Sequence, residues 1–99
     1  MVTLNTNFQM QARYKLTVKG CVQGVGYRYF CHRKAAEYDI CGYAMNLPDG
    51  SVELDIEGEK SLISEFIKDL KIGPMNASVK AVLAEEIPYE NIYTEFKIY

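Results

Sequence analysis

The chain has 99 residues, of which 48% are hydrophobic and 24% charged, and its formal net charge is −2. This length and composition are typical of one globular domain and exclude a separate cofactor-binding domain. With 11 basic and 13 acidic side chains and no basic tract, the sequence argues against nucleic-acid binding, and no apolar run is long enough to cross a membrane.

The N-terminal segment MVTLNTNFQMQA has neither the basic start nor the continuous apolar stretch of a secretory signal. We expect residues 1–12 to form a flexible extension, residues 13–99 to form the folded domain, and the protein to be cytoplasmic. Three cysteines, Cys21, Cys31 and Cys41, lack the paired spacing of a zinc site. We expect them to be reduced and mostly buried.

The segment Arg13–Gly20 alternates apolar and polar residues, which predicts a strand with one buried face. A glycine-containing loop follows. Apolar residues then recur at helical spacing from Tyr27 to Tyr38, with charged residues on the opposite face. This pattern predicts an amphipathic helix of about three turns.

The segment CGYAMNLPDGSVELDIEG, residues 41–58, predicts two strands joined by a tight turn. Pro48 presets the backbone angle φ, Asp49 caps the turn, and Gly50 tolerates a positive φ. Acidic and apolar residues alternate along the second strand. We therefore expect its acidic face, which includes Asp55 and Glu57, to be exposed to solvent.

A second apolar stripe predicts a helix from Glu59 to Ile72, which Gly73-Pro74 ends. The segments SVKAVLAEE and YTEFKIY predict two more strands. The order is therefore β-α-β-β-α-β with an added C-terminal edge strand. Right-handed crossovers place both helices on one face of an antiparallel sheet, so the expected fold class is α+β, a two-layer sandwich.

The stretch GCVQGVGYR, residues 20–28, joins the first strand to the first helix. It is not a Walker-type loop, because Tyr27 follows Gly26 where that motif has lysine. It is not the dinucleotide-binding fingerprint either, because Tyr29 stands where the third glycine is required.

Arg28 lies in the first turn of the predicted helix, where a cation is mildly unfavourable because the helix start carries a partial positive charge. An anion bound between the arginine and the helix start would make this position favourable for a cation. Main-chain N–H groups around Gly20, Gly24 and Gly26 can form an anion-binding nest, and a guanidinium can hold phosphate with paired hydrogen bonds. These residues alone leave two interpretations open: a phosphate site, or a glycine-rich turn with a solvated arginine.

Asn46 ends the strand that follows the first helix. It is either an ordinary turn-flanking residue or part of a site. Its strand runs parallel to the first one, so Asn46 and the glycine loop lie at the same edge of the sheet. A carboxamide cannot act as a general base, but it can position a water molecule.

Two separate segments, VKGCVQGVGYR and GYAMNLPDGSVELDIEG, resemble the signature segments of the acylphosphatases, and the similarity continues through GPMNASV. It covers the chain from about Arg13 to its end. The resemblance implies a ferredoxin-like sandwich, a phosphate-binding arginine at Arg28, and an asparagine at Asn46 that orients the attacking water. It also implies a phosphate cradle of main-chain amides from Cys21, Val22, Gln23, Gly24, Val25 and Gly26.

Two residues depart from the family pattern. Tyr27 stands where phenylalanine is usual and adds a hydroxyl near the site, and Asp39 stands where glycine is usual after the first helix. Aspartate tolerates a positive φ better than most residues, so we expect Asp39 to end the helix in that conformation.

The resemblance implies a hydrolase that cleaves acyl phosphates, with inorganic phosphate as product and inhibitor and a monomer as the working form. The leaving carboxylate has a conjugate acid with a pKa of about 4, so it departs without a proton donor. We expect no metal, no cofactor and no covalent intermediate. We hypothesise that the phosphate of the substrate accepts the proton of the water.

Two other functions stay open. A non-catalytic module that binds a small anion or a partner would use the same nest and Arg28, but would not need Asn46. An RNA-binding sheet would need exposed aromatic residues in basic surroundings. The expected outward residues are polar and net acidic, so we expect no RNA binding: Lys15, Thr17, Lys19, Glu53, Asp55 and Glu57. His32, one turn beyond Arg28, is expected to lie at the surface.

Overall fold

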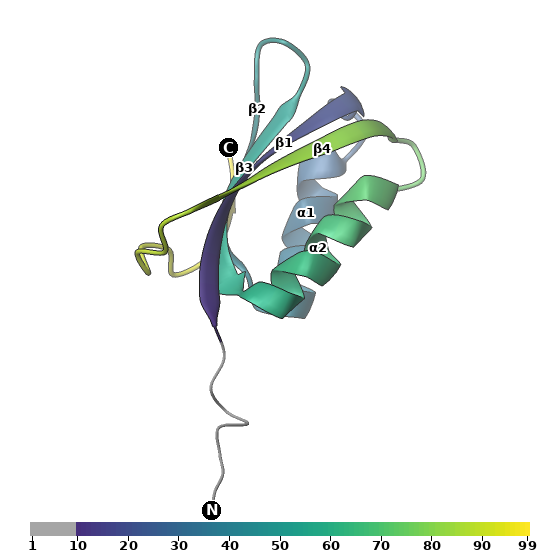
Figure 1. Ribbon diagram of the computed structural model, residues 1–99. Helices are drawn as coiled ribbons and strands as arrows, with labels where there is room; N and C mark the ends of the chain where they lie inside the picture. Colours follow the sequence, from purple (N-terminus) through teal and green to yellow (C-terminus); the bar gives the residue numbers. More distant parts are fainter. Residues whose placement is uncertain (1–9) are drawn as a thin grey trace, which may run out of the picture.

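Two helices cover one face of a five-stranded sheet, which is the two-layer α+β sandwich expected from the sequence (Figure 1). The computed structural model describes residues 10–99. In chain order the elements are β1 (Gln11–Cys21), α1 (Tyr27–Tyr38), β2 (Cys41–Asn46), β3 (Val52–Glu59), α2 (Lys60–Ile72), β4 (Ser78–Ile87) and β5 (Phe96–Ile98). No helix in this part of the chain is both long and apolar enough to traverse a bilayer.

The first strand begins at Gln11, two residues before the predicted start at Arg13. Ala12 is buried in the core, because strand alternation places it on the same face as Leu16 and Val18. Residues 1–9 of the predicted extension lie outside the described residues.

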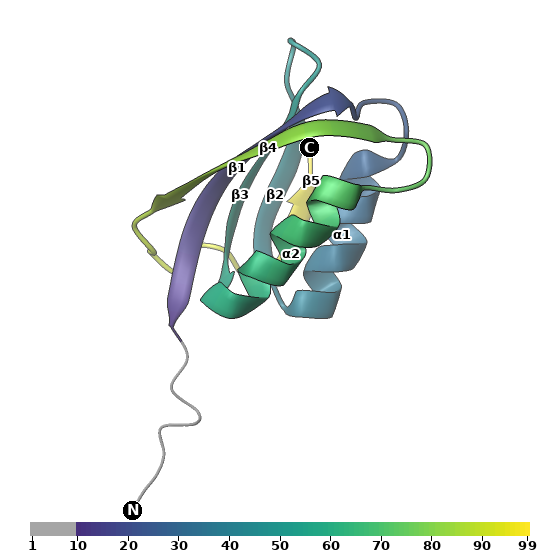
Figure 2. The ribbon, with the colours of Figure 1, turned by 45° about the vertical axis from the view of Figure 1, so that its right-hand side comes forward.

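The strand order across the sheet is β4-β1-β3-β2-β5. The four strands from β4 to β2 pair in antiparallel fashion, as expected, whereas β5 joins β2 in parallel. Because β1 and β2 both run antiparallel to β3, they point the same way. The last residues of β1 and β2 and the start of α1 therefore lie at the same end of the sheet, and the C-terminus also reaches that end (Figure 2).

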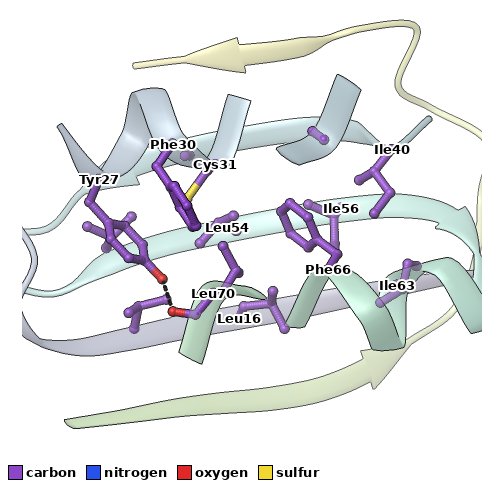
Figure 3. Packing of buried hydrophobic residues seen from close by; sticks show 14 of the residues in the cluster. Leu16, Tyr27, Phe30, Cys31, Ile40, Leu54, Ile56, Ile63, Phe66 and Leu70 are labelled. Carbon is purple, nitrogen blue, oxygen red and sulfur yellow. Dashed lines mark hydrogen bonds between the residues drawn. The ribbon is translucent and has the colours of Figure 1, made fainter. Parts of the chain in front are cut away.

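The core lies between the sheet and the two helices and uses the apolar faces that the sequence predicted. From the sheet, Leu16, Leu54 and Ile56 are fully buried, and Phe66 of α2 packs among them (Figure 3). The buried residues of α1 are Tyr27, Phe30, Cys31 and Ala35, and those of α2 are Ile63, Phe66 and Leu70.

The segment between β4 and β5, residues 88–95, crosses from one edge of the sheet to the other on the side away from the helices (Figure 1). Its main chain is held by the carboxylate of Glu57 on β3. The N–H groups of Glu90, Asn91, Ile92 and Tyr93 donate to the two carboxylate oxygens at 2.8–3.4 Å. Glu57 is only 4% exposed.

A second buried carboxylate lies beside Glu57. Asp55, 5% exposed, accepts paired hydrogen bonds from Arg13 Nε at 2.9 Å and Nη2 at 3.0 Å. The guanidinium of Arg13 also lies 5.9 Å from the ring centre of Tyr93. The prediction that the acidic face of β3 is exposed was therefore wrong for Asp55 and Glu57. The crossing segment supplies the donors for Glu57, and Arg13 of β1 supplies those for Asp55.

Asp39 ends α1 in the left-handed conformation, with φ 55° and ψ 47°, which confirms the positive φ expected there. Its N–H donates to the carbonyl of Ala35, as the helix end requires. The negative side chain lies at the negative end of the helix dipole, and its Cβ is strained in this conformation.

We expect Asp39→Gly to raise the free energy of unfolding by about 1 kcal/mol, because it removes both the strain and the unfavourable charge. Urea unfolding measures this change. Ala36→Gly, at an exposed position inside the same helix, is the matched control and should lower stability by about 1 kcal/mol. A gain of stability in the control, or a loss in Asp39→Gly, would contradict the explanation.

Replacing Glu57 by glutamine should lower the free energy of unfolding by about 2 kcal/mol, because charge-assisted hydrogen bonds are lost and an amide NH₂ faces main-chain donors. Equilibrium unfolding in urea at neutral pH tests this. Glu85→Gln, at an exposed position of β4, is the control and should change stability by less than about 0.5 kcal/mol. Equal effects from the two changes would show that Glu57 does not anchor the crossing segment.

Candidate active site

The loop between β1 and α1 exposes its main chain at two glycines. Gly24 and Gly26 have φ of +74° and +77°, and a Cβ at either position would meet no atom within 4 Å. The positive φ therefore explains glycine here, and crowding does not. Gly26 is the N-cap of α1, where no side chain caps the helix and no acidic residue lies in the first turn. Neither the cap nor the first turn therefore offsets the positive end of the helix dipole with a side chain.

A cavity of about 260 Å³ lies at this helix start. Its lining combines main chain from the glycine loop, side chains from the first turn of α1 and one residue of β5: Val22, Gly24, Gly26, Tyr27, Arg28, Tyr29 and Ile98. Of the residues that the sequence grouped into one site, Gly24, Gly26 and Arg28 line this cavity, whereas Gly20 and Asn46 are not among its lining residues. The sequence did not indicate that β5 would contribute a wall.

Arg28 is half-buried at the edge of this cavity, and its Nη1 donates to the main-chain oxygen of Tyr99. The guanidinium has five N–H donors. One bond to Tyr99 fixes the side chain and leaves other donors for an anion in the cavity.

Asn46 lies at the same end of the sheet and on its helix-facing side. Ala44, two residues earlier in β2, is fully buried against the helices, and strand alternation places Asn46 on the same face. Ala44 also accepts a hydrogen bond of 2.9 Å from the N–H of Tyr99, the residue that Arg28 contacts. Tyr99 thus joins Arg28 to β2, the strand that ends at Asn46.

The side-chain oxygen of Asn46 is buried and has no hydrogen-bond partner among the described residues. A buried acceptor without a partner is costly, about 1–3 kcal/mol, and is rare in folded proteins. Such an atom, at the same end of the sheet as the cavity, is suited to accept a hydrogen bond from a small molecule such as water.

Gln23 joins the glycine loop to the hairpin that follows Asn46. Its Nε2 donates to the carbonyl of Leu47 at 2.7 Å and to that of Ser51 at 2.9 Å. From the sequence, only a main-chain role was expected for Gln23. A long amide side chain in a loop of small and apolar residues was the available signal, but its partners lie 24 and 28 residues away.

The other residues of the predicted cradle have different surroundings. Cys21 is the last residue of β1, pairs with Ser78 of β4 and is exposed. Val22 is buried and lines the cavity, and Val25 packs against the core. Gly20 lies inside β1, where a Cβ would fall 2.1 Å from the carbonyl oxygen of Ser78.

The hydroxyl of Tyr27 is directed away from the loop and into the core. It donates to the carbonyl of Leu70 in the last turn of α2 at 2.8 Å (Figure 3). Burial raises the pKa of this phenol far above its usual value. The hydroxyl expected near the site therefore satisfies one of the free carbonyls of a helix end and holds the two helices together.

Burial also raises the pKa of the Cys31 thiol, to about 12. Cys41 is half-buried, and desolvation together with nearby carboxylates raises its pKa as well. His32 is exposed, as expected, and its ring stacks on that of Tyr29. Within residues 10–99, no three acidic, cysteine or histidine side chains gather to hold a metal ion.

The family model for acylphosphatase matches residues 14–98. The acylphosphatase of Chlorobaculum tepidum is 38% identical over 88 residues, which cover 89% of this chain and 96% of that relative. The acylphosphatase of Thermus thermophilus is 55% identical over 65 residues, 66% of this chain and 74% of that relative. The crystal structure of acylphosphatase from Bacillus subtilis has a TM-score of 0.86 and 31% identity, covering 91% of this chain and 99% of that one.

Gln23→Glu removes the two N–H donors of the side chain with almost no change in side-chain shape, and it places a carboxylate next to the carbonyls of Leu47 and Ser51. We expect it to lower the free energy of unfolding by about 1–3 kcal/mol. Amide chemical shifts should change in the loop 21–26 and in the turn 47–51. Gln11→Glu, at an exposed position of β1, is the control. If the shifts in those two segments stay unchanged, Gln23 does not join them.

Proposed function

Because the chain belongs to the acylphosphatase family, we propose that it hydrolyses acyl phosphates and that residues around the start of α1 carry out the reaction. The family's reaction is hydrolysis of the mixed anhydride of a carboxylic and a phosphoric acid to carboxylate and inorganic phosphate. In our proposal the substrate phosphate binds in the cavity at the start of α1, and a water molecule held by Asn46 attacks it.

The phosphate is held by two kinds of positive group. Main-chain N–H groups of the cradle from Cys21 to Gly26, together with the start of α1, supply fixed dipoles, and Arg28 supplies a full charge. Arg28 keeps several donors beyond the one that Tyr99 uses. Charge spreads over the phosphoryl oxygens in the transition state, so these donors act where charge develops.

The observation that carries the proposal is the buried Oδ1 of Asn46, which has no hydrogen-bond partner within residues 10–99 and lies at the same end and on the same face of the sheet as Arg28. A water molecule that donates one proton to this oxygen has its lone pair fixed in direction. The carboxamide NH₂ adds a donor that can hold the water or a phosphoryl oxygen. Such positioning contributes much of the catalysis of phosphoryl transfer.

In the reaction the water oxygen forms a bond to phosphorus while the bond from phosphorus to the carboxylate oxygen breaks. The electron pair leaves with the carboxylate, whose conjugate acid has a pKa of about 4, so no general acid is needed. The proton of the water passes to a phosphoryl oxygen of the substrate. The products are carboxylate and inorganic phosphate, which competes for the same site. The steps use no metal or cofactor.

Arg28→Ala should lower kcat/KM for benzoyl phosphate by about 10²–10³-fold or more, because a charged donor to the transition state is lost. It should also weaken inhibition by inorganic phosphate. Arg33→Ala, an exposed arginine of the same helix, should leave both within about twofold. If Arg28→Ala hydrolysed benzoyl phosphate as fast as the parent, the assignment of Arg28 would fail.

Asn46→Ala should lower kcat by about 10²-fold or more and leave the inhibition constant of inorganic phosphate nearly unchanged, because it removes water positioning and not the anion site. Asn76→Ala, in the exposed turn after α2, is the control. Loss of phosphate binding in parallel with kcat would show that Asn46 supports the anion site instead. A fully active Asn46→Ala variant would overturn its role.

A further inference from the structure

The cavity beside Arg28 is larger than a phosphate requires. It has a volume of about 260 Å³, whereas a phosphate takes the space of a few water molecules of about 30 Å³ each. Beyond the glycines and Arg28, its lining is apolar or aromatic. Val22 and Tyr27 are each 1% exposed and form its floor, whereas Tyr29 and Ile98 are 65% and 39% exposed and form its open rim.

The ring of Tyr29 is held in place by its neighbours although it is exposed. It stacks on His32, with ring centres 6.3 Å apart and an angle of 11° between the planes. His32 in turn meets the ring of Phe96 on β5 edge-on, with centres 6.0 Å apart. A ring fixed in this way loses little conformational entropy when a ligand packs against it.

The position of Tyr29 relative to Arg28 follows from the helix. Consecutive residues in the first turn project about 100° apart, yet both Arg28 and Tyr29 line this cavity, so a ligand whose phosphate is held by Arg28 has Tyr29 within its reach. Ile98 reaches the same rim from the other side of the cavity, on the strand whose next residue contacts Arg28. Among the described residues that line the cavity, Arg28 is the only charged one.

We propose that Tyr29 and Ile98 form the subsite for the acyl group and select acyl phosphates with an aromatic or other apolar acyl group. This inference rests on the proposed function and names the substrate class for the same site. An apolar acyl group removes Tyr29 and Ile98 from water, while a charged one would lose hydration without gaining a partner. A small acyl group such as acetyl gains little from this rim.

The test compares benzoyl phosphate with acetyl phosphate in the parent, Tyr29→Ala and Tyr29→Phe. Tyr29→Ala should lower the ratio of the two kcat/KM values by about tenfold, almost entirely through benzoyl phosphate. Inhibition by inorganic phosphate should stay unchanged. Tyr29→Phe should keep the ratio, since it keeps the ring. Leaving-group reactivity is the same in every variant, so a change of ratio reports the side chain alone.

Tyr89→Ala is the matched control, because Tyr89 is 40% exposed and lines a different cavity with Gln11 and Gly58 at the opposite end of the sheet. It should leave the ratio unchanged. An unchanged ratio in Tyr29→Ala, or an equal loss for both substrates, overturns the acyl subsite while the proposed function stands. Failure of the parent to hydrolyse either substrate overturns both proposals.

Discussion

The buried carboxylate of Glu57 is the contact on which the architecture of the site depends. It gathers main-chain N–H groups from four consecutive residues of the crossing segment and fixes the path from one edge of the sheet to the other. Only because the chain takes this path does β5 reach the far edge and pair with β2. That pairing delivers Ile98 to the cavity and the main chain of Tyr99 to Arg28. The charge of Glu57, on the outer face of the sheet, thus helps to determine which residues reach the cavity on the helix-facing side.

The electrostatics of the site follow from the residues in the first turn of α1. The first turn of α1 carries an arginine, no acidic residue and no side-chain cap. Two positive groups held together, with no acidic side chain in that turn to offset them, lower stability and favour an anion. Gln23 and the Tyr99 contact keep this arrangement in place by joining the loop and the guanidinium to neighbouring strands. The resulting order reduces the rearrangement required when a phosphate binds.

The sequence predicted most of the fold, because strand alternation and helical spacing directly encode which faces are buried. It also predicted that the glycine loop and Asn46 share an edge, since that follows from strand direction. Alternation cannot distinguish a solvated face from one covered by a distant segment, so the burial of Asp55 and Glu57 was missed. The partners of Gln23 and Tyr27 are main-chain carbonyls, which carry no sequence signal. For the same reason the contribution of β5 to the cavity emerged only from the tertiary structure.

The placement of β1 between β3 and β4 has a consequence for how the molecule assembles. β1 pairs with β3 (Val52–Glu59) on one side and with β4 (Ser78–Ile87) on the other, where Arg13 lies opposite Ile87. Long chain loops must close before these pairs form, and such topologies fold slowly. During synthesis on the ribosome, the side of β1 that pairs with β4 therefore stays unpaired until most of the polypeptide has emerged. A strand made before both of its partners is thus among the last to be fully paired.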